Sequence, residues 1–156
     1  MTWLNVIAGQ LSVADPDNAG ADFANAASGS TEIETLISEV NATLDPVRDS
    51  RFTVFHDACQ YFETDFDFPA TGAISIGNAS DPSPARIAEI QTLVSDQGIK
   101  CVLAEPQFNP GLVITVLDGT EAQTGILDLL GPDLELGSAL YHQLIRNLST
   151  ALARCM

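Results

Sequence analysis

The chain has 156 residues, a net charge of −15 and 46% hydrophobic residues, which is the composition of one globular domain. Its 6 basic residues stand against 21 acidic ones, so the composition argues against nucleic acid and anionic membrane surfaces as partners. No run reaches the ~18 apolar residues of a membrane span, and Met1-Thr2-Trp3-Leu4 does not resemble a signal peptide. We therefore expect a cytoplasmic protein or part of a longer secreted one.

The front section, residues 1–50, shows only helical patterns. A first helix is predicted over residues 3–14. The second part of the section has apolar residues at helical spacing: Ile33, Leu36, Ile37, Val40, Leu44 and Val47. Between the two parts lies a weak helix former around Gly29, and Thr31 with Glu34 has the spacing of a capping box. We expect either one long helix kinked near Gly29 or two helices.

From residue 51 onward, strand and helix patterns alternate. Short β-branched or apolar runs predict four strands: Phe52–Phe55, Ala73–Ile76, Ile99–Ala104 and Thr124–Leu127. Helical patterns follow each of them: Cys59–Asp65, Ser83–Gly98, Asn109–Gly119 and about Ser138–Arg154. Four βα units in succession imply a parallel four-stranded sheet with helices on both faces. We therefore predict an α/β fold for residues 51–156, preceded by the helical section.

Polar residues follow the predicted strands: His56, Asn78, Glu105 and Asp128. In a parallel sheet they share one edge, and open α/β sheets bind ligands there. Histidine and carboxylate side chains suit zinc or manganese. Any loop at this edge would be polar, however, and zinc takes four ligands. We expect tight metal binding to need ligands from elsewhere.

Cys59 lies three residues beyond His56 and admits two interpretations. A cysteine beside a histidine can be a nucleophile or a metal ligand. Alternatively, Cys59 is a small buried residue under the strand, and Asp57 favours the dipole of the next helix. The sequence has no G-x-S-x-G elbow, no phosphate-binding glycine loop and no full triad, which favours the packing role.

Two further cysteines fall at the opposite edge of the predicted sheet. Cys101 lies near the start of the third predicted strand, and Cys155 lies at the end of the last helix. Helices run antiparallel to strands in βα units, so both residues lie at the amino edge. A disulfide there would imply an oxidising compartment. Two buried thiols fit the same placement equally well.

The ordered set of motifs carries a family resemblance. These motifs are FTVFHDACQYFE, CVLAEPQFNP, GILDLLG and a last helix that ends in Cys. Together they resemble the C-terminal half of the zinc-uptake substrate-binding proteins of bacterial ABC transporters. IAGQLSVADPDNA resembles the helices that precede that half. The resemblance implies one lobe of a two-lobe protein that holds zinc between its lobes, with residues 1–50 as a remnant of the interdomain helices.

The resemblance also implies roles for single residues. His56 falls on a histidine ligand of the second lobe, and Asp128 falls on an acidic residue that binds or neighbours the metal. Three other residues are expected to surround this site: Glu105, Asp57 and Cys59. The family's disulfide falls on Cys101 and Cys155. Cys59 stands where the family usually has tyrosine.

The family's first lobe, with two histidine ligands and a signal peptide, would precede Met1. We therefore expect a C-terminal lobe alone, with zinc bound in the micromolar range or more weakly and manganese less favoured. The resemblance implies a periplasmic location and an ABC permease as partner, and a homodimer could form through the surface that faces the other lobe. The alternatives are an interaction domain without a metal role and a small hydrolase-type enzyme using His56 and Cys59.

Overall fold

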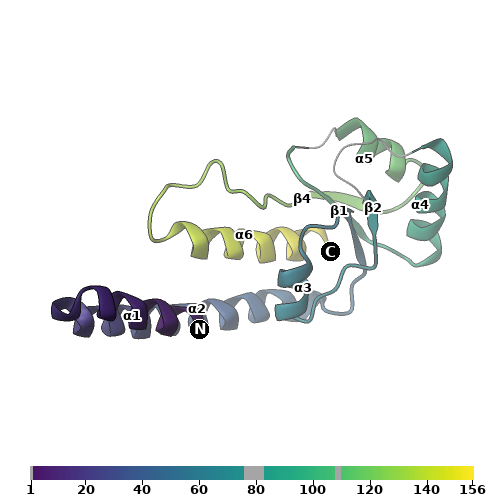
Figure 1. Cartoon of the computed structure of the whole chain (residues 1–156). Coiled ribbons are helices and arrows are strands. Elements are labelled where there is room, and N and C mark those ends of the chain that lie inside the picture. The colour runs from purple at the N-terminus through teal and green to yellow at the C-terminus, as the bar shows by residue number, and fades with distance from the viewer. Residues whose placement is uncertain (1, 76–82, 108–109) are drawn as a thin grey trace. The chain divides into compact units, whose positions relative to one another are not determined.

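The computed structural model describes residues 2–75, 83–107 and 110–156 (Figure 1). It divides into two compact units, Met1–Glu39 and Val40–Met156. The expected assignment of residues 1–50 and 51–156 to two domains stays a prediction. The predicted strand end at Ile76 lies outside the described residues, as does the predicted helix start at Asn109.

Helix α1 and most of helix α2 build the first unit, and the last residues of α2 belong to the second. Helix α1 spans Thr2–Ala14, a 3-10 turn spans Pro16–Asn18, and α2 spans Ala19–Leu44 without a break at Gly29. The predicted capping box is therefore wrong. The Thr31 hydroxyl donates to the carbonyl of Ala27, one turn back in the same helix, at 3.2 Å. A threonine can satisfy its hydroxyl in this way inside a helix, so it need not mark a helix start.

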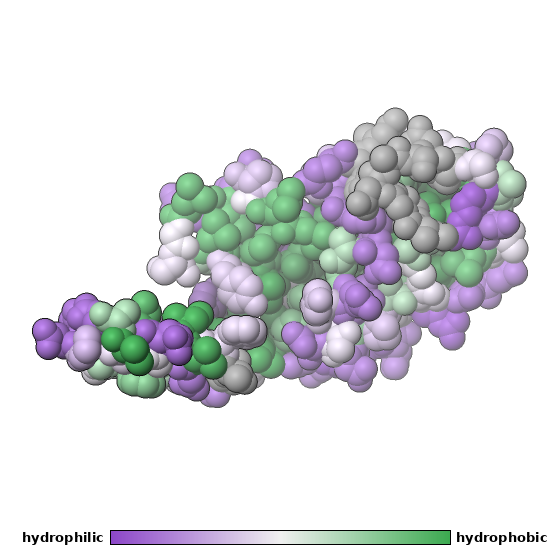
Figure 2. Space-filling view, viewed as in Figure 1, coloured by the Kyte–Doolittle hydropathy of each residue, from purple (hydrophilic) through white to green (hydrophobic). Residues whose placement is uncertain are grey.

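The first unit exposes many apolar side chains, which Figure 2 shows gathered on its surface. They come from both helices: Trp3, Val6, Ile7, Leu11, Val13, Phe23 and Ile37. A hydrophobic patch of this kind marks a surface that another protein segment can cover.

The second unit is built on a four-stranded sheet in which all strands are parallel. The strands are β1 (Phe52–His56), β2 (Ala73–Ser75), β3 (Cys101–Ala104) and β4 (Gln123–Ile126), in the order β2-β1-β3-β4. A 3-10 turn over Asp45–Val47 leads into it. The helices are α3 (Gln60–Asp65), α4 (Pro84–Asp96), α5 (Pro110–Leu117) and α6 (Leu140–Cys155). The predicted α/β fold class is confirmed.

Helices cover both faces of the sheet, as predicted (Figure 1). Helices α4 and α5 pack on one face around a buried cluster: Phe55, Ile74, Ile90, Val94, Ile99, Val102, Ala104, Val113 and Val116. Helices α3 and α6 lie on the opposite face, where Phe62 and Leu148 line one small cavity with Phe52 and Val54 of β1. Residues that alternate along β1 thus feed two separate apolar layers.

The ends of α4 explain where β3 begins. Ser83 caps the helix by accepting a hydrogen bond from the backbone N–H of Arg86 at 3.3 Å. Gly98 ends it with a φ of +62°, and the N–H of Ile99 donates to the Val94 carbonyl at 3.0 Å. Because this helix cap uses the N–H of Ile99, β3 begins at Cys101, two residues later than predicted.

The predicted disulfide between Cys101 and Cys155 is confirmed, with 5.6 Å between the two Cα atoms. The bridge lies directly over Gly125 of β4. A Cβ atom at Gly125 would lie 2.8 Å from the Cys155 sulfur and 2.8 Å from a Leu103 methyl group. The glycine is therefore what allows α6 to approach the sheet closely enough for the bridge.

Gly125→Ala is expected to lower the free energy of unfolding by about 1–3 kcal/mol, because the added methyl group overpacks this contact. Urea denaturation measures the change. Gly9→Ala is the control, since no atom lies within 4 Å of its added Cβ and alanine favours the α1 helix. A Gly125→Ala chain as stable as the unchanged chain would contradict the close approach.

Candidate metal centre

His56 is the last residue of β1 and emerges at the carboxyl edge of the sheet. The preceding residues from Phe52 to Phe55 are all buried, which holds the strand in register. The backbone of His56 is paired with Ser75 of β2. Its side chain is 25% exposed, so the imidazole is held by the fold but reaches the surface.

Glu105 lies beside His56 because β1 and β3 are neighbours in the sheet. It follows Ala104 at the end of β3, and its Oε1 lies 3.0 Å from His56 Nδ1. A carboxylate only accepts hydrogen bonds, so Nδ1 carries the hydrogen in this contact. The neutral imidazole therefore has its lone pair on Nε2, the tautomer that a metal ion binds. The Glu105 side chain is only 16% exposed, which shields the pair from water.

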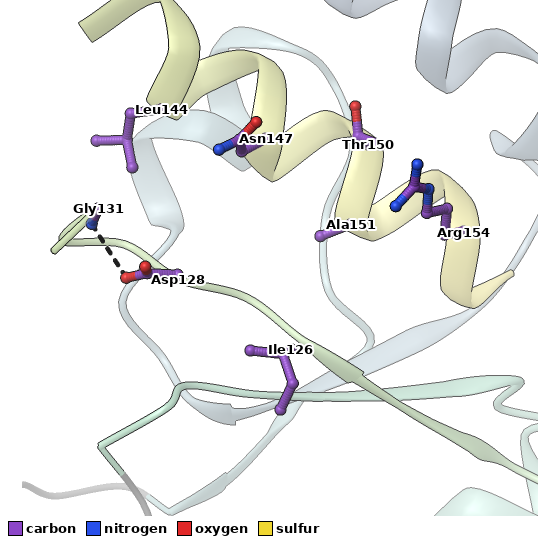
Figure 3. Close-up of a pocket in the computed structure, with 8 residues that line it drawn as sticks. All are labelled: Ile126, Asp128, Gly131, Leu144, Asn147, Thr150, Ala151 and Arg154. Atoms are coloured by element: carbon purple, nitrogen blue, oxygen red, sulfur yellow. Dashed lines mark hydrogen bonds between the residues drawn. The ribbon is translucent and has the colours of Figure 1, made fainter. Parts of the chain in front are cut away.

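Asp128 follows β4 and fixes the loop that begins there. Its Oδ1 accepts hydrogen bonds from the backbone N–H of Leu130 at 3.0 Å and from that of Gly131 at 3.1 Å; Figure 3 shows the second of these. Gly131 has a φ of +60°, which favours glycine. The sequence prediction missed this structural role, although Asp followed by Gly three residues later is typical of a turn.

Asp128 also lines a pocket of about 250 Å³ between β4 and α6 (Figure 3). The other lining residues are Ile126, Gly131, Leu144, Asn147, Thr150, Ala151 and Arg154. His56 and Glu105 do not line this pocket. The structure thus brings His56 and Glu105 together, whereas a common hollow for His56 and Asp128 stays a prediction.

The remaining expected site residues have different surroundings. Asp57 is exposed, and Cys59 is buried as a free thiol just before α3. Burial, with smaller contributions from the negative charges of Glu63, Glu105 and Asp57, raises the pKa of the Cys59 thiol to about 12. The thiol therefore stays protonated at neutral pH, so it is neither an activated nucleophile nor a ready thiolate ligand.

No group of three or more His, Cys, Asp or Glu side chains that could hold a metal ion occurs within the described ranges. Asn78, another expected residue of this edge, lies outside them. None of the described helices has the length and apolar character needed to cross a membrane. The described residues therefore include one histidine oriented by a carboxylate at the carboxyl edge of the sheet, and a second carboxylate on the loop after β4.

The profile of the family described as zinc-uptake complex component A, periplasmic, matches residues 1–155. The chain belongs to this family. A zinc-uptake system protein ZnuA of Brucella abortus is 46% identical over 150 residues, which cover 96% of this chain and 45% of that protein. The Paracoccus denitrificans ZnuA is 40% identical over 155 residues, covering 99% of this chain and 48% of the relative.

A crystal structure of ZnuA has the same fold as this member of the component A family. The TM-score is 0.78 at 24% identity, and the match covers 97% of this chain and 56% of the solved one. The family resemblance stated from the sequence motifs is thereby confirmed. The chain spans about half the length of the curated relatives it matches.

Proposed function

We propose that this chain forms the C-terminal lobe of a zinc receptor that delivers the ion to an ABC permease in the membrane. Membership of the zinc-uptake family over residues 1–155 carries this proposal. The curated relatives are named as high-affinity zinc uptake proteins, and the chain matches about half of their length. A periplasmic location is supported by the family description and by the disulfide, which needs an oxidising compartment.

In this proposal zinc is bound by His56 and Asp128, and Glu105 orients the histidine. Metal-binding histidines commonly donate their second ring N–H to a carboxylate, and the 3.0 Å contact between His56 Nδ1 and Glu105 is of this kind. In that tautomer, Nε2 is the ring nitrogen that would bind the metal. An imidazole ligand suits zinc better than manganese, which prefers oxygen ligands. Asp57 and Cys59 surround the site without binding the ion.

The proposed affinity of this chain for zinc is micromolar or weaker. A tight zinc site has about four ligands, and the proposed one supplies a single histidine and a single carboxylate from these residues. Further ligands would come from another part of a two-lobe receptor. Zinc would then hold two lobes together, and release of the ion would accompany their separation.

The proposal that the chain is not an enzyme rests on the state of Cys59. A hydrolase-type mechanism with His56 would need the thiolate, and the raised thiol pKa of about 12 disfavours it at neutral pH. The relatives are named as uptake proteins.

Zinc titration by calorimetry tests this function. The unchanged chain should bind one zinc ion with micromolar affinity, and His56→Ala should weaken binding at least tenfold because it removes the nitrogen ligand. Glu105→Gln should weaken it by about 10- to 100-fold, since the ring loses its charged orienting partner.

His142→Ala is the matched control, because it removes the second of the chain's 2 histidines without touching the proposed ligands. Its zinc affinity should equal that of the unchanged chain. Nanomolar binding that survives His56→Ala would show that other residues hold the metal, and the proposed site would then be wrong.

A further inference from the structure

Strand β4 forms one edge of the sheet, and half of its main-chain polar groups point away from β3. The N–H of Gln123 donates to Lys100 at 2.8 Å and that of Leu127 donates to Ala104 at 2.9 Å. Parallel strands use alternate residues for such bonds, so the groups of Thr124 and Ile126 point to the open edge. Within the described residues nothing is hydrogen-bonded to them.

The sequence of this edge lacks the charged and proline residues that often block the addition of another strand. Its sequence, Gln123-Thr124-Gly125-Ile126, has no charge and no proline. Thr124 is exposed and Ile126 is 58% exposed. Edges without lysine, proline or a bulge are templates for pairing with a further strand.

Helix α6 overhangs the same edge and forms a groove with it. Leu144, Asn147, Ala151 and Arg154 recur along one side of the helix and line the pocket of about 250 Å³ together with Ile126. Asp128 and Arg154 lie at opposite ends of this pocket in Figure 3. The groove thus has both apolar and polar side chains along its length, with a negative residue toward the carboxyl end of β4 and a positive residue toward its amino end.

We propose that a second copy of this chain docks on the β4 edge, with the two β4 strands antiparallel. Thr124 of each copy then faces Ile126 of the other, and the pair of edges forms about four main-chain hydrogen bonds. The two sheets become one continuous sheet of eight strands. The two α6 helices lie side by side on the same face, and Leu144 and Ala151 of each are covered by the other helix.

The charges of the groove are complementary to those of a second copy, which favours a second copy over an unrelated peptide as the occupant. A two-fold axis turns the positive end of one groove toward the negative end of the other. Arg154 of each copy therefore lies toward Asp128 of its partner, and no further assumption about the occupant's sequence is needed.

The net charge of −15 on each chain opposes this association. At 0.15 M salt the Debye length is about 8 Å, so the repulsion between whole chains is screened, whereas contacts in the groove persist. The interface is also small, which sets the expected dissociation constant in the micromolar range. The association needs neither zinc nor His56.

Sedimentation equilibrium of the 156-residue chain in 0.15 M salt and EDTA tests the proposal. A monomer–dimer equilibrium is expected, and Thr124→Pro should raise its dissociation constant at least tenfold. Proline removes the outward N–H and leaves the bonds to β3 intact, as edge strands tolerate. Thr124→Val is the matched control, since it keeps the N–H and the β-branched shape, and it should leave the constant unchanged. Circular dichroism verifies that both variants are folded.

A second pair of variants tests the charges. Arg154→Glu should also weaken the dimer at least tenfold, because two carboxylates then face each other at each end. Lys100→Glu changes the net charge equally without touching the groove and should have a far smaller effect. A chain that stays monomeric at millimolar concentration, a dimer that requires zinc, or a dimer unaffected by Thr124→Pro would each overturn the proposal.

Discussion

Replacing both Cys101 and Cys155 by alanine is expected to lower the free energy of unfolding by about 4 kcal/mol. The bridge joins residues 54 positions apart, so its loss releases a long loop in the unfolded chain. For a chain of this size the change corresponds to a melting temperature about 10 °C lower. Urea denaturation in EDTA measures it, because the fold should not need the metal.

Cys59→Ala is the control for that experiment. It removes the free thiol and leaves the bridge intact. Its free energy of unfolding should therefore fall by much less than the ~4 kcal/mol expected without the bridge. Alkylation of the unfolded chain without reductant should modify one cysteine. Modification of all 3 cysteines in oxidised protein, or equal stability of the bridged and unbridged chains, would contradict the structural role of the disulfide.

The strands and helices of the second unit could be predicted because each is set by local physics. Ser83 and Gly98 mark the ends of α4, and the apolar run of β1 has the length of a buried strand. The helices of the front section were harder to predict, since the Thr31 hydroxyl donates to a carbonyl within α2 and does not cap a helix start. Local sequence alone does not distinguish that arrangement from a helix start.

The site could be predicted only in part, because the order of the strands decides which side chains meet. The order β2-β1-β3-β4 puts Glu105 next to His56, whereas Asp128 is two strands away from His56, roughly 10 Å at the backbone. Periodicity along the chain carries no information on that order. His56 and Asp128 can therefore share a metal only above the end of β3, where Glu105 lies. The contact of Gly125 with the disulfide could not be predicted either, because it also depends on which strands and helices are neighbours.

The other large effect on stability is expected from a substitution in the buried cluster between β1 and helices α4 and α5, next to His56. Phe55→Ala should destabilise the chain by about 3–5 kcal/mol, because it opens a cavity in the cluster that joins β1 to α4 and α5. Phe55 is 3% exposed and directly precedes His56. Thermal unfolding followed by circular dichroism measures the loss.

Phe55→Leu keeps most of the volume and should cost less than about 1.5 kcal/mol, which makes it the matched control. The two variants also test how the core supports the metal site. Because the buried strand holds the imidazole beside Glu105, zinc affinity should fall in the alanine variant at temperatures where it is still folded. It should be kept in the leucine variant. If the folded alanine variant binds zinc as the unchanged chain does, the position of His56 does not depend on this layer.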